Sequence, residues 1–404
     1  MKILQVNKFF YHRGGVEQHF FDLANLLKRH GIEVGFFSMK DPRNESTEFT
    51  KYFVKNINFE KLNWRAVLNV SKVFYSWEAK RKIKKLLKNF YPEVAHLHLI
   101  YGILSPSILS ALKNAQVPVV LTIHDWKLIC PNRMLFTQGA VCERCKNKKY
   151  YQCAKYCCVK NSFPQSVVAD KEAYFHNFLK IYENKIDRFI APSEFIKKTL
   201  VDFGWSAEKI IVLPHFLPGD VNKVSVAPPL PASAKFVFVG RLVAEKGISK
   251  LVDFWLRENI AYPLEIFGDG PLYSDLNKKI KIAGNDKIIL HGQVERQHIL
   301  TSLKEFTAMI VPSVWYEPFG LVATEAWSQG LPIIATRMGA LEELCEASHA
   351  GILYDPQNSE ALKKALHNIQ DMKYRRQAVE YMRGHHLPEE YFGSLLAVYR
   401  QLKK

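Results

Sequence analysis

Residues 312–332, PSVWYEPFGLVATEAWSQGLP, separate two short apolar runs that we predict to be β-strands, Met309–Val311 and Ile333–Ala335. A proline and a glycine near the middle of the segment favour a loop. Leu321–Trp327, which follows them, has the composition of a helix start. Strand, loop, helix and strand in this order are typical of one unit of a parallel sheet. The segment therefore predicts an α/β fold.

Two carboxylates stand eight positions apart in this segment, Glu317 on the predicted loop and Glu325 on the first turns of the predicted helix. A single Glu is usually a solvated surface charge. Here the pair lies in an apolar context beside a helix N-terminus, whose free backbone N–H groups suit a phosphate. Carboxylates that accept hydroxyl hydrogen bonds beside such amides suit a nucleotide sugar. We therefore expect Glu317 to face an open crevice.

The bulk composition indicates a globular protein of two domains. The chain has 404 residues, which is too long for one typical domain. Its composition, with 48% hydrophobic and 24% charged residues, is that of a globular protein. It contains no apolar run of about 18 residues, so we expect no membrane-spanning helix. The short apolar stretch before Asn7 is typical of a strand and not of a signal peptide. We therefore expect a cytoplasmic protein.

The positive charge is concentrated in the first half. Residues 1–215 hold 34 Lys and Arg against 18 Asp and Glu, whereas residues 216–404 hold 22 against 21. A basic amphipathic helix is predicted at Trp77–Lys88. Such a run is usually only a solvated helix face, but with the excess charge it indicates an anionic partner. We predict an anionic membrane surface, at about 1 kcal/mol per basic residue, and no nucleic acid, because interleaved aromatic readout motifs are lacking.

Short apolar runs alternate with amphipathic stretches throughout the chain, which predicts parallel sheets with helices between their strands. The other strand candidates are Ile3–Val6, Val34–Phe37, Val94–Leu97, Val119–Ile123, Phe189–Ala191 and Ile210–Leu213 in the first half, and Phe236–Val239, Leu264–Phe267 and Ile288–Leu290 in the second. A Pro-rich stretch at 214–234 predicts a linker. We expect two doubly wound domains whose ligand crevices face each other across a cleft.

Arg241 and Lys246 lie in the loop after the first strand of the second half. Arg grips a phosphate with a bidentate fork, and Lys neutralises one as a point charge. Two such cations in a loop are more often solvated surface charges. Phosphate binding is favoured here because Glu317 and Glu325 follow in the sequence. Gly268 follows the next strand, in a Gly-Asp-Gly sequence that an ordinary turn would also explain.

His124 and Asp125 follow a predicted strand of the first half, at the end where α/β sheets keep their ligands. A lone His is more often a core or surface residue than a catalyst. Gly14 and Gly15 join the first strand to the first helix. They lack the third glycine of the dinucleotide fingerprint.

All but one of the seven cysteines lie in a single segment of the first half. Cys142-x2-Cys145, followed by Cys153 and then Cys157 or Cys158, has the ligand count and clustering of a four-thiolate zinc site. A cytoplasmic setting disfavours disulfides, which leaves metal binding or free thiols. We predict a structural zinc that takes no part in catalysis.

Taken together, these motifs resemble the retaining glycosyltransferases of family 4, which have the GT-B fold of two Rossmann-like domains and a C-terminal helix that crosses back onto the first domain. The resemblance rests on Glu317-x7-Glu325, on the segment Val239–Gly247 and on the Gly14-Gly15 loop. The expected boundaries are 1–215 for an acceptor-binding domain with a Cys-rich insertion at 126–165, 216–384 for a nucleotide-sugar-binding domain, and 385–404 for the returning helix.

The same resemblance implies a role for each motif. Glu317 would contact hydroxyls of the donor sugar and Glu325 its ribose. Arg241 and Lys246 would clamp the diphosphate, and His124 would contact the sugar ring near the reacting carbon. The remaining donor-binding residues would be Gly15, Gly268, Val294, Phe319, Gly320 and Leu321. A subset of the family has a Cys-rich insertion whose last Cys leads into Val-x-x-Ser, which favours Cys158 over Cys157 as the fourth zinc ligand.

We therefore predict a retaining hexosyltransferase at the inner face of the cell membrane. It would move a sugar from a UDP- or GDP-linked donor to a glycan, expected to be lipid-linked, in bacterial surface polysaccharide or lipopolysaccharide synthesis. No cofactor is needed for catalysis. One alternative is a GT-B sugar-nucleotide epimerase, which would need no basic first half. Another is a nucleic-acid-binding protein with a four-cysteine zinc module, which would leave the spacing of Glu317 and Glu325 unexplained.

Overall fold

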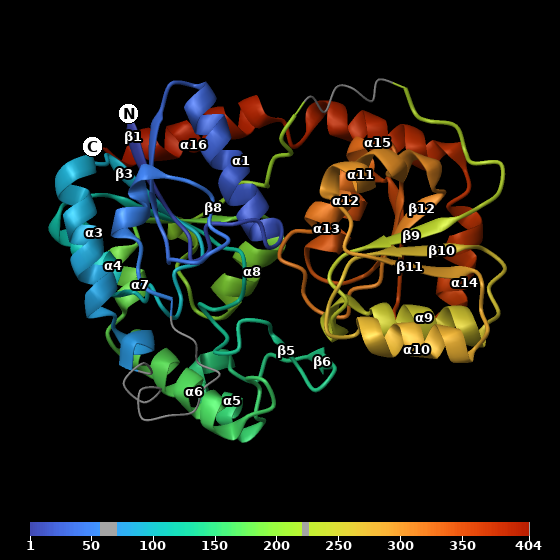
Figure 1. Ribbon diagram of the computed structural model, residues 1–404, viewed down its shortest axis with the longest axis horizontal. Coiled ribbons are helices and arrows are strands. Elements are labelled where there is room, and N and C mark those ends of the chain that lie inside the picture. The colour runs from blue at the N-terminus through green and yellow to red at the C-terminus, as the bar shows by residue number, and fades with distance from the viewer. Residues whose placement is uncertain (57–70, 220–225, 404) are drawn as a thin grey trace. The chain divides into compact units, whose positions relative to one another are not determined.

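The computed structural model describes residues 1–56, 71–219 and 226–403, which form two compact units, each with its own six-stranded parallel sheet (Figure 1). Unit 1 comprises Met1–Met134, Glu143–Pro214 and Pro388–Lys404, and unit 2 comprises Leu135–Cys142 and His215–Leu387. Residues 220–225 of the predicted linker lie outside the described residues. Two parallel α/β units confirm the predicted fold class.

Unit 1 is doubly wound, with the strand order β2-β1-β3-β4-β7-β8. Its strands are β1 (Lys2–Val6), β2 (Glu33–Phe37), β3 (Val94–Leu97), β4 (Val119–Thr122), β7 (Arg188–Ala191) and β8 (Ile210–Val212). Its helices are α1 (Gly15–Arg29), α3 (Trp77–Phe90), α4 (Ser107–Asn114), α5 (Tyr151–Lys155), α6 (Phe163–Phe178), α7 (Ile181–Lys185), α8 (Glu194–Asp202) and α16 (Pro388–Leu402). The order in which the chain adds strands to the sheet reverses between β1 and β3, and such folds bind ligands at this switch point.

Helix α16, the last of the chain, belongs to unit 1, which confirms the predicted return of the C-terminal helix. Figure 1 shows it with α1 on one side of the sheet, opposite α3, α4 and α7. The Tyr399 hydroxyl of α16 lies 2.5 Å from Nδ1 of the buried His96. On the same helix, the Phe392 ring stacks on His30 of the segment after α1, with ring centres 3.7 Å apart. Aromatic contacts therefore hold the helix on unit 1.

Unit 2 has the strand order β11-β10-β9-β12-β13-β14, which reverses between β9 and β12. Its strands are β9 (Phe236–Val239), β10 (Leu264–Phe267), β11 (Ile288–Gly292), β12 (Ala308–Val311), β13 (Ile333–Thr336) and β14 (Gly351–Tyr354). Its helices are α9 (Ile248–Arg257), α10 (Tyr273–Ile282), α11 (Arg296–Ser302), α12 (Leu321–Ser328), α13 (Ala340–Ser348), α14 (Ser359–Asn368) and α15 (Met372–Gly384). Figure 1 shows α9 and α10 on one face of this sheet and α12, α13 and α15 on the other.

The alternation of side chains along β9 explains why unit 2 has two cores. Phe236 and Phe238 pack with Trp255 of α9 in one core, whereas Val237 between them packs with Trp327 of α12 in the other. Successive residues of a strand point to opposite faces, so a fully apolar strand serves both. Both tryptophans are fully buried.

Three strands of the described residues were not predicted from the sequence. Strand β14 closes one edge of the unit 2 sheet, and its residues are mostly half-buried. A short hairpin of β5 (Phe136–Thr137) and β6 (Ala140–Val141) interrupts the Cys-rich segment. Within the described residues, no helix is long and apolar enough to cross a membrane.

Candidate functional site

The candidate site in unit 2 lies on the loops that follow β9 and β12, at the point where the strand order reverses. These strands are neighbours, so their loops meet. The Val314 N–H donates to the Glu245 carbonyl at 2.9 Å. Gly247 has a φ of +70°, and a Cβ there would lie 1.9 Å from the carbonyl oxygen of Pro312. Only glycine allows the two loops to approach this closely.

Glu317 and Lys246 form a buried ion pair at this junction. Lys246 Nζ lies 2.5 Å from Glu317 Oε1, and the Ser313 hydroxyl donates to the same oxygen at 2.6 Å. Burial acts to raise the pKa of Glu317, but the Lys246 charge and the hydrogen bonds from Lys246 and Ser313 outweigh it, so the pKa is lowered. Glu317 lies on a loop as predicted. It is only 5% exposed, so the open crevice expected beside it stays a prediction.

A third loop holds the backbone of Glu317 in place. Gly339, directly before α13, has a φ of +64°, and a Cβ there would lie 2.7 Å from the Glu317 nitrogen. The Ala340 N–H at the start of α13 donates to the Glu317 carbonyl at 3.0 Å. The loop after β13 therefore positions the carboxylate from its backbone side.

Arg241 is not part of the buried pair. Its guanidinium is largely exposed and lies 3.5 Å from Glu245, so the two predicted clamp residues contact different carboxylates. Gly268 lies behind this loop, where a Cβ would meet the Gly240 carbonyl oxygen at 1.9 Å. The glycine is therefore explained by the close approach of the loops after β9 and β10.

Glu325 lies on α12, as predicted, and Gly320 directly before this helix has a φ of +101°. The Glu325 carboxylate pairs with Arg296 of α11, whose Nε donates to it at 2.8 Å. The sequence analysis missed Arg296. The one sequence signal for Arg296 was its position two residues after Val294, a predicted donor-binding residue.

The other predicted donor-binding residues of unit 2 are packing residues in this structure. The Phe319 ring is buried, and its centre lies 5.0 Å from that of His215 and 5.6 Å from that of His386. Val294 and Leu321 are half-buried and pack against the same core. Their predicted contacts with a donor stay predictions.

In unit 1, His124 belongs to a cluster of imidazoles. Its Nε2 lies 2.8 Å from Nδ1 of His98, and Nε2 of His98 lies 3.1 Å from the Gln5 side-chain oxygen. The centre of the His19 ring lies 5.7 Å from that of His124. Burial, with smaller contributions from His19 and His96, keeps the pKa of His124 well below its usual value. His124 is therefore a neutral imidazole near pH 7, so it can hydrogen-bond but carries no charge.

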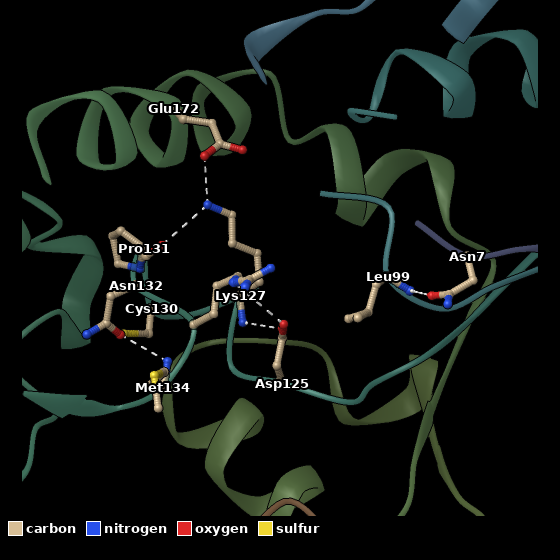
Figure 2. Close-up of polar contacts among 10 residues, drawn as sticks. Asn7, Leu99, Asp125, Lys127, Cys130, Pro131, Asn132, Met134 and Glu172 are labelled. Carbon is tan, nitrogen blue, oxygen red and sulfur yellow. Dashed lines mark hydrogen bonds and ion pairs between the residues drawn. The ribbon is translucent and has the colours of Figure 1, made fainter. Parts of the chain in front are cut away.

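Asp125 and Lys127, one and three residues after His124, make a second set of polar contacts (Figure 2). The Lys127 N–H donates to Asp125 Oδ1 at 3.0 Å. Its ammonium lies 2.7 Å from Glu172 of α6, a buried pair that the sequence analysis missed. Burial raises the pKa of Asp125. Gly15, a predicted donor-binding residue, is the exposed first residue of α1.

The cysteines form no metal site among the described residues, where no group of three or more His, Cys, Asp or Glu side chains is placed to hold a metal ion. A hydrogen bond with Cys158, together with burial, raises the pKa of Cys153. The Cys130 thiol donates to Asn132 at 2.9 Å (Figure 2). The zinc site stays a prediction, with the ligands Cys142, Cys145, Cys153 and Cys158.

Two doubly wound units, the second with a carboxylate–lysine pair at its switch point, have the architecture of a GT-B protein, and comparison with known proteins identifies a glycosyltransferase. Residues 227–385 match the family model for glycosyl transferases group 1, and residues 13–218 match the model for glycosyltransferase family 4. The second match covers half of the chain, so the chain belongs to glycosyltransferase family 4.

Two curated glycosyltransferases illustrate the similarity to known sequences. The uncharacterized glycosyltransferase MJ1178 of Methanocaldococcus jannaschii is 24% identical over 368 residues, which is 91% of this chain and 87% of that protein. The lipopolysaccharide core biosynthesis glycosyltransferase LpsE of Rhizobium meliloti is 28% identical over 210 residues, 50% of this chain and 59% of that protein.

Solved structures share the fold. The lipopolysaccharide outer core galactosyltransferase WaaB superposes with a TM-score of 0.64 at 18% identity, covering 98% of this chain and 99% of that one. HepE of Anabaena, solved with UDP-glucose, gives a TM-score of 0.66 at 16% identity, covering 99% and 100%.

Proposed function

We propose that this glycosyltransferase is a retaining hexosyltransferase that moves a sugar from a nucleotide-sugar donor to a lipid-linked glycan acceptor in surface polysaccharide synthesis. The observation that carries the proposal is the buried contact of Lys246 and Ser313 with Glu317 at the switch point of unit 2. The names of LpsE and WaaB support the lipopolysaccharide setting, and the UDP-glucose complex of HepE supports the donor class. Both family models describe glycosyltransferases, which supports sugar transfer over an epimerase or a nucleic-acid-binding protein.

The proposed roles follow from the charges at the site. An ammonium has three donors, and Glu317 occupies one of those of Lys246, so others remain for a diphosphate oxygen. The exposed Arg241 would grip the same diphosphate with its fork. Glu317 has a second carboxylate oxygen for sugar hydroxyls, and Glu325, with Arg296, would hold the ribose.

The proposed reaction is transfer on one face of the sugar. The acceptor oxygen bonds to the anomeric carbon on the side that the diphosphate leaves. The electron pair of the breaking carbon–oxygen bond moves to the diphosphate, which takes the proton of the acceptor hydroxyl. Stabilising the charge that develops on the diphosphate is then the main catalytic contribution. Lys246 supports this path, because its charge is fixed in place before the donor binds.

A panel of UDP-, GDP- and ADP-sugars tests the donor. We expect one nucleotide to raise the melting temperature and to be released with turnover when acceptor is present. Glu325→Gln should weaken binding of the free nucleoside diphosphate, whereas Glu317→Gln should weaken only the sugar-dependent part. No response to any nucleotide would reject the proposed function, and equal losses in both variants would reject the division of roles.

We further propose that α3 docks on anionic lipid. Its exposed cations are Arg81, Lys84, Lys85 and Lys88. Lys82, which also lies in the predicted basic helix, is half-buried and pairs with Glu78 at 3.5 Å. Trp77 at the start of α3 is 73% exposed, and Phe178 on α6 is 84% exposed. The Lys80 ammonium lies 5.2 Å from the centre of the Trp77 ring, and an exposed aromatic ring beside a cation suits a membrane interface.

Charge reversal tests this surface. Arg81→Glu, Lys84→Glu and Lys88→Glu together should abolish binding to vesicles that contain anionic lipid, because three charges change sign and the net charge of the helix falls by six units within a Debye length of about 8 Å. Vesicle sedimentation at rising salt measures the effect. The matched control reverses Lys278, Lys281 and Lys364, which are exposed cations of unit 2. Equal loss in the control, or binding to neutral vesicles that salt does not weaken, would contradict the proposal.

A further inference from the structure

Three cations from separate segments of unit 1 converge at the edge of its sheet where β1 and β4 end. Lys8 follows β1, Arg13 precedes α1, and Arg133 lies in the segment after β4. The Lys8 ammonium and the Arg13 guanidinium lie 5.0 and 4.5 Å from the centre of the same ring, that of Phe9. Arg133 reaches the site from the far side, where its Nε lies 3.9 Å from Asp125.

The donors of this cluster are almost unused. No hydrogen bond or ion pair joins the side chains of Lys8 and Arg13 to any residue that the structure describes, and the 3.9 Å contact of Arg133 is too long for a hydrogen bond. An ammonium carries three donors and a guanidinium five. Lys8 is half-buried, where unmet donors are costly. A ligand that supplies hydrogen-bond acceptors can therefore bind to this cluster.

The electrostatics of Lys8 favour an anion. Burial first, and then the charges of Arg133 and Arg13, lower the pKa of Lys8 to about 8. Glu17 and Asp125 oppose this shift but do not cancel it. An anion beside the three cations would raise the pKa again, so binding near pH 8 takes up protons.

We propose that Lys8, Arg13 and Arg133 bind an anionic group of the glycan acceptor, either a phosphate or the carboxylate of a uronic acid, next to His124. The proposal rests on the proposed function and narrows its acceptor to an acidic one. Asp125, which Arg133 contacts, directly follows His124, and the loop after β1 flanks the switch point of the sheet. The donor diphosphate has its own cations in unit 2, Arg241 and Lys246, so these three serve a different anion.

Calorimetric titration with inorganic phosphate and, separately, with glucuronate tests the site. We expect Lys8→Met and Arg133→Met each to weaken binding of the preferred anion about tenfold. The control is Arg29→Met at the opposite end of α1, about 20 Å from Gly15 along the helix, which should bind like wild type. The anion that binds more tightly to wild type identifies the source, phosphate or sugar acid. Arg133 is exposed, so its variant remains informative if Lys8→Met fails to fold.

Two further measurements, proton uptake on anion binding and UDP affinity, distinguish this site from the donor site. At pH 8, binding of the preferred anion should take up protons in wild type but not in Lys8→Met, and affinity should fall as the pH rises through 8. UDP affinity should be the same in all three variants. Equal anion affinity in the variants and the Arg29→Met control, or a parallel loss of UDP affinity, would overturn the proposal. Phosphate and glucuronate need no donor, so these titrations stay decisive even if no nucleotide sugar is turned over.

Discussion

Replacing Lys246 with methionine should lower kcat about a thousandfold, the upper range for removing one preorganised group that stabilises developing charge. Methionine keeps the apolar stem of the side chain but removes the ammonium that lies 2.5 Å from Glu317. The diphosphate then leaves without its fixed counter-charge. The buried carboxylate also loses the charge that lowers its pKa, so the pKa of Glu317 should rise.

Release of nucleoside diphosphate in the presence of acceptor measures the effect, with the melting temperature as a check on folding. The matched control is Lys250→Met. Lys250 lies four residues further on, is exposed, and makes no ion pair with any described residue. A loss of less than tenfold in Lys246→Met would remove the charge clamp from the mechanism.

Gly247→Ala should destabilise unit 2 by at least about 3 kcal/mol and inactivate what remains folded. The left-handed backbone at a φ of +70° costs about 1–2 kcal/mol for alanine. The added Cβ would also lie 1.9 Å from the Pro312 carbonyl oxygen, so one of the two loops must move. Lys246 and Ser313 are the neighbours of these two residues, so the movement separates them.

Urea unfolding followed by tryptophan fluorescence measures this loss. Gly284→Ala separates backbone strain from the clash, because Gly284 has a similar φ of +57° but nothing within 4 Å of its would-be Cβ. We expect a cost of about 1 kcal/mol there. If the two variants lose the same stability, the close approach of the loops is not what requires Gly247.

The strands were predictable where local pattern and burial agree. Phe236–Val239 is apolar on both faces because both faces are covered, and the structure gives the predicted bounds. Strand β14 was missed because it is mostly half-buried at a sheet edge, where burial selects less strongly for an apolar pattern. The positions of Glu317 on a loop and Glu325 on a helix were also local properties, and both are confirmed.

The sequence by itself determined the α/β class, the presence of a last helix and the residue types at the ends of the strands, because period-2 and period-3.6 patterns are local. The return of that helix to the first domain was expected only from the family resemblance. Only the tertiary structure decided which of these residues meet. Lys246 and Glu317 are 71 positions apart and touch because β9 pairs with β12. The cluster of Lys8, Arg13 and Arg133 likewise depends on the order of strands in the unit 1 sheet. Contacts of this kind arise from strand order and side-chain direction, and neither is encoded in the spacing of residues along the chain.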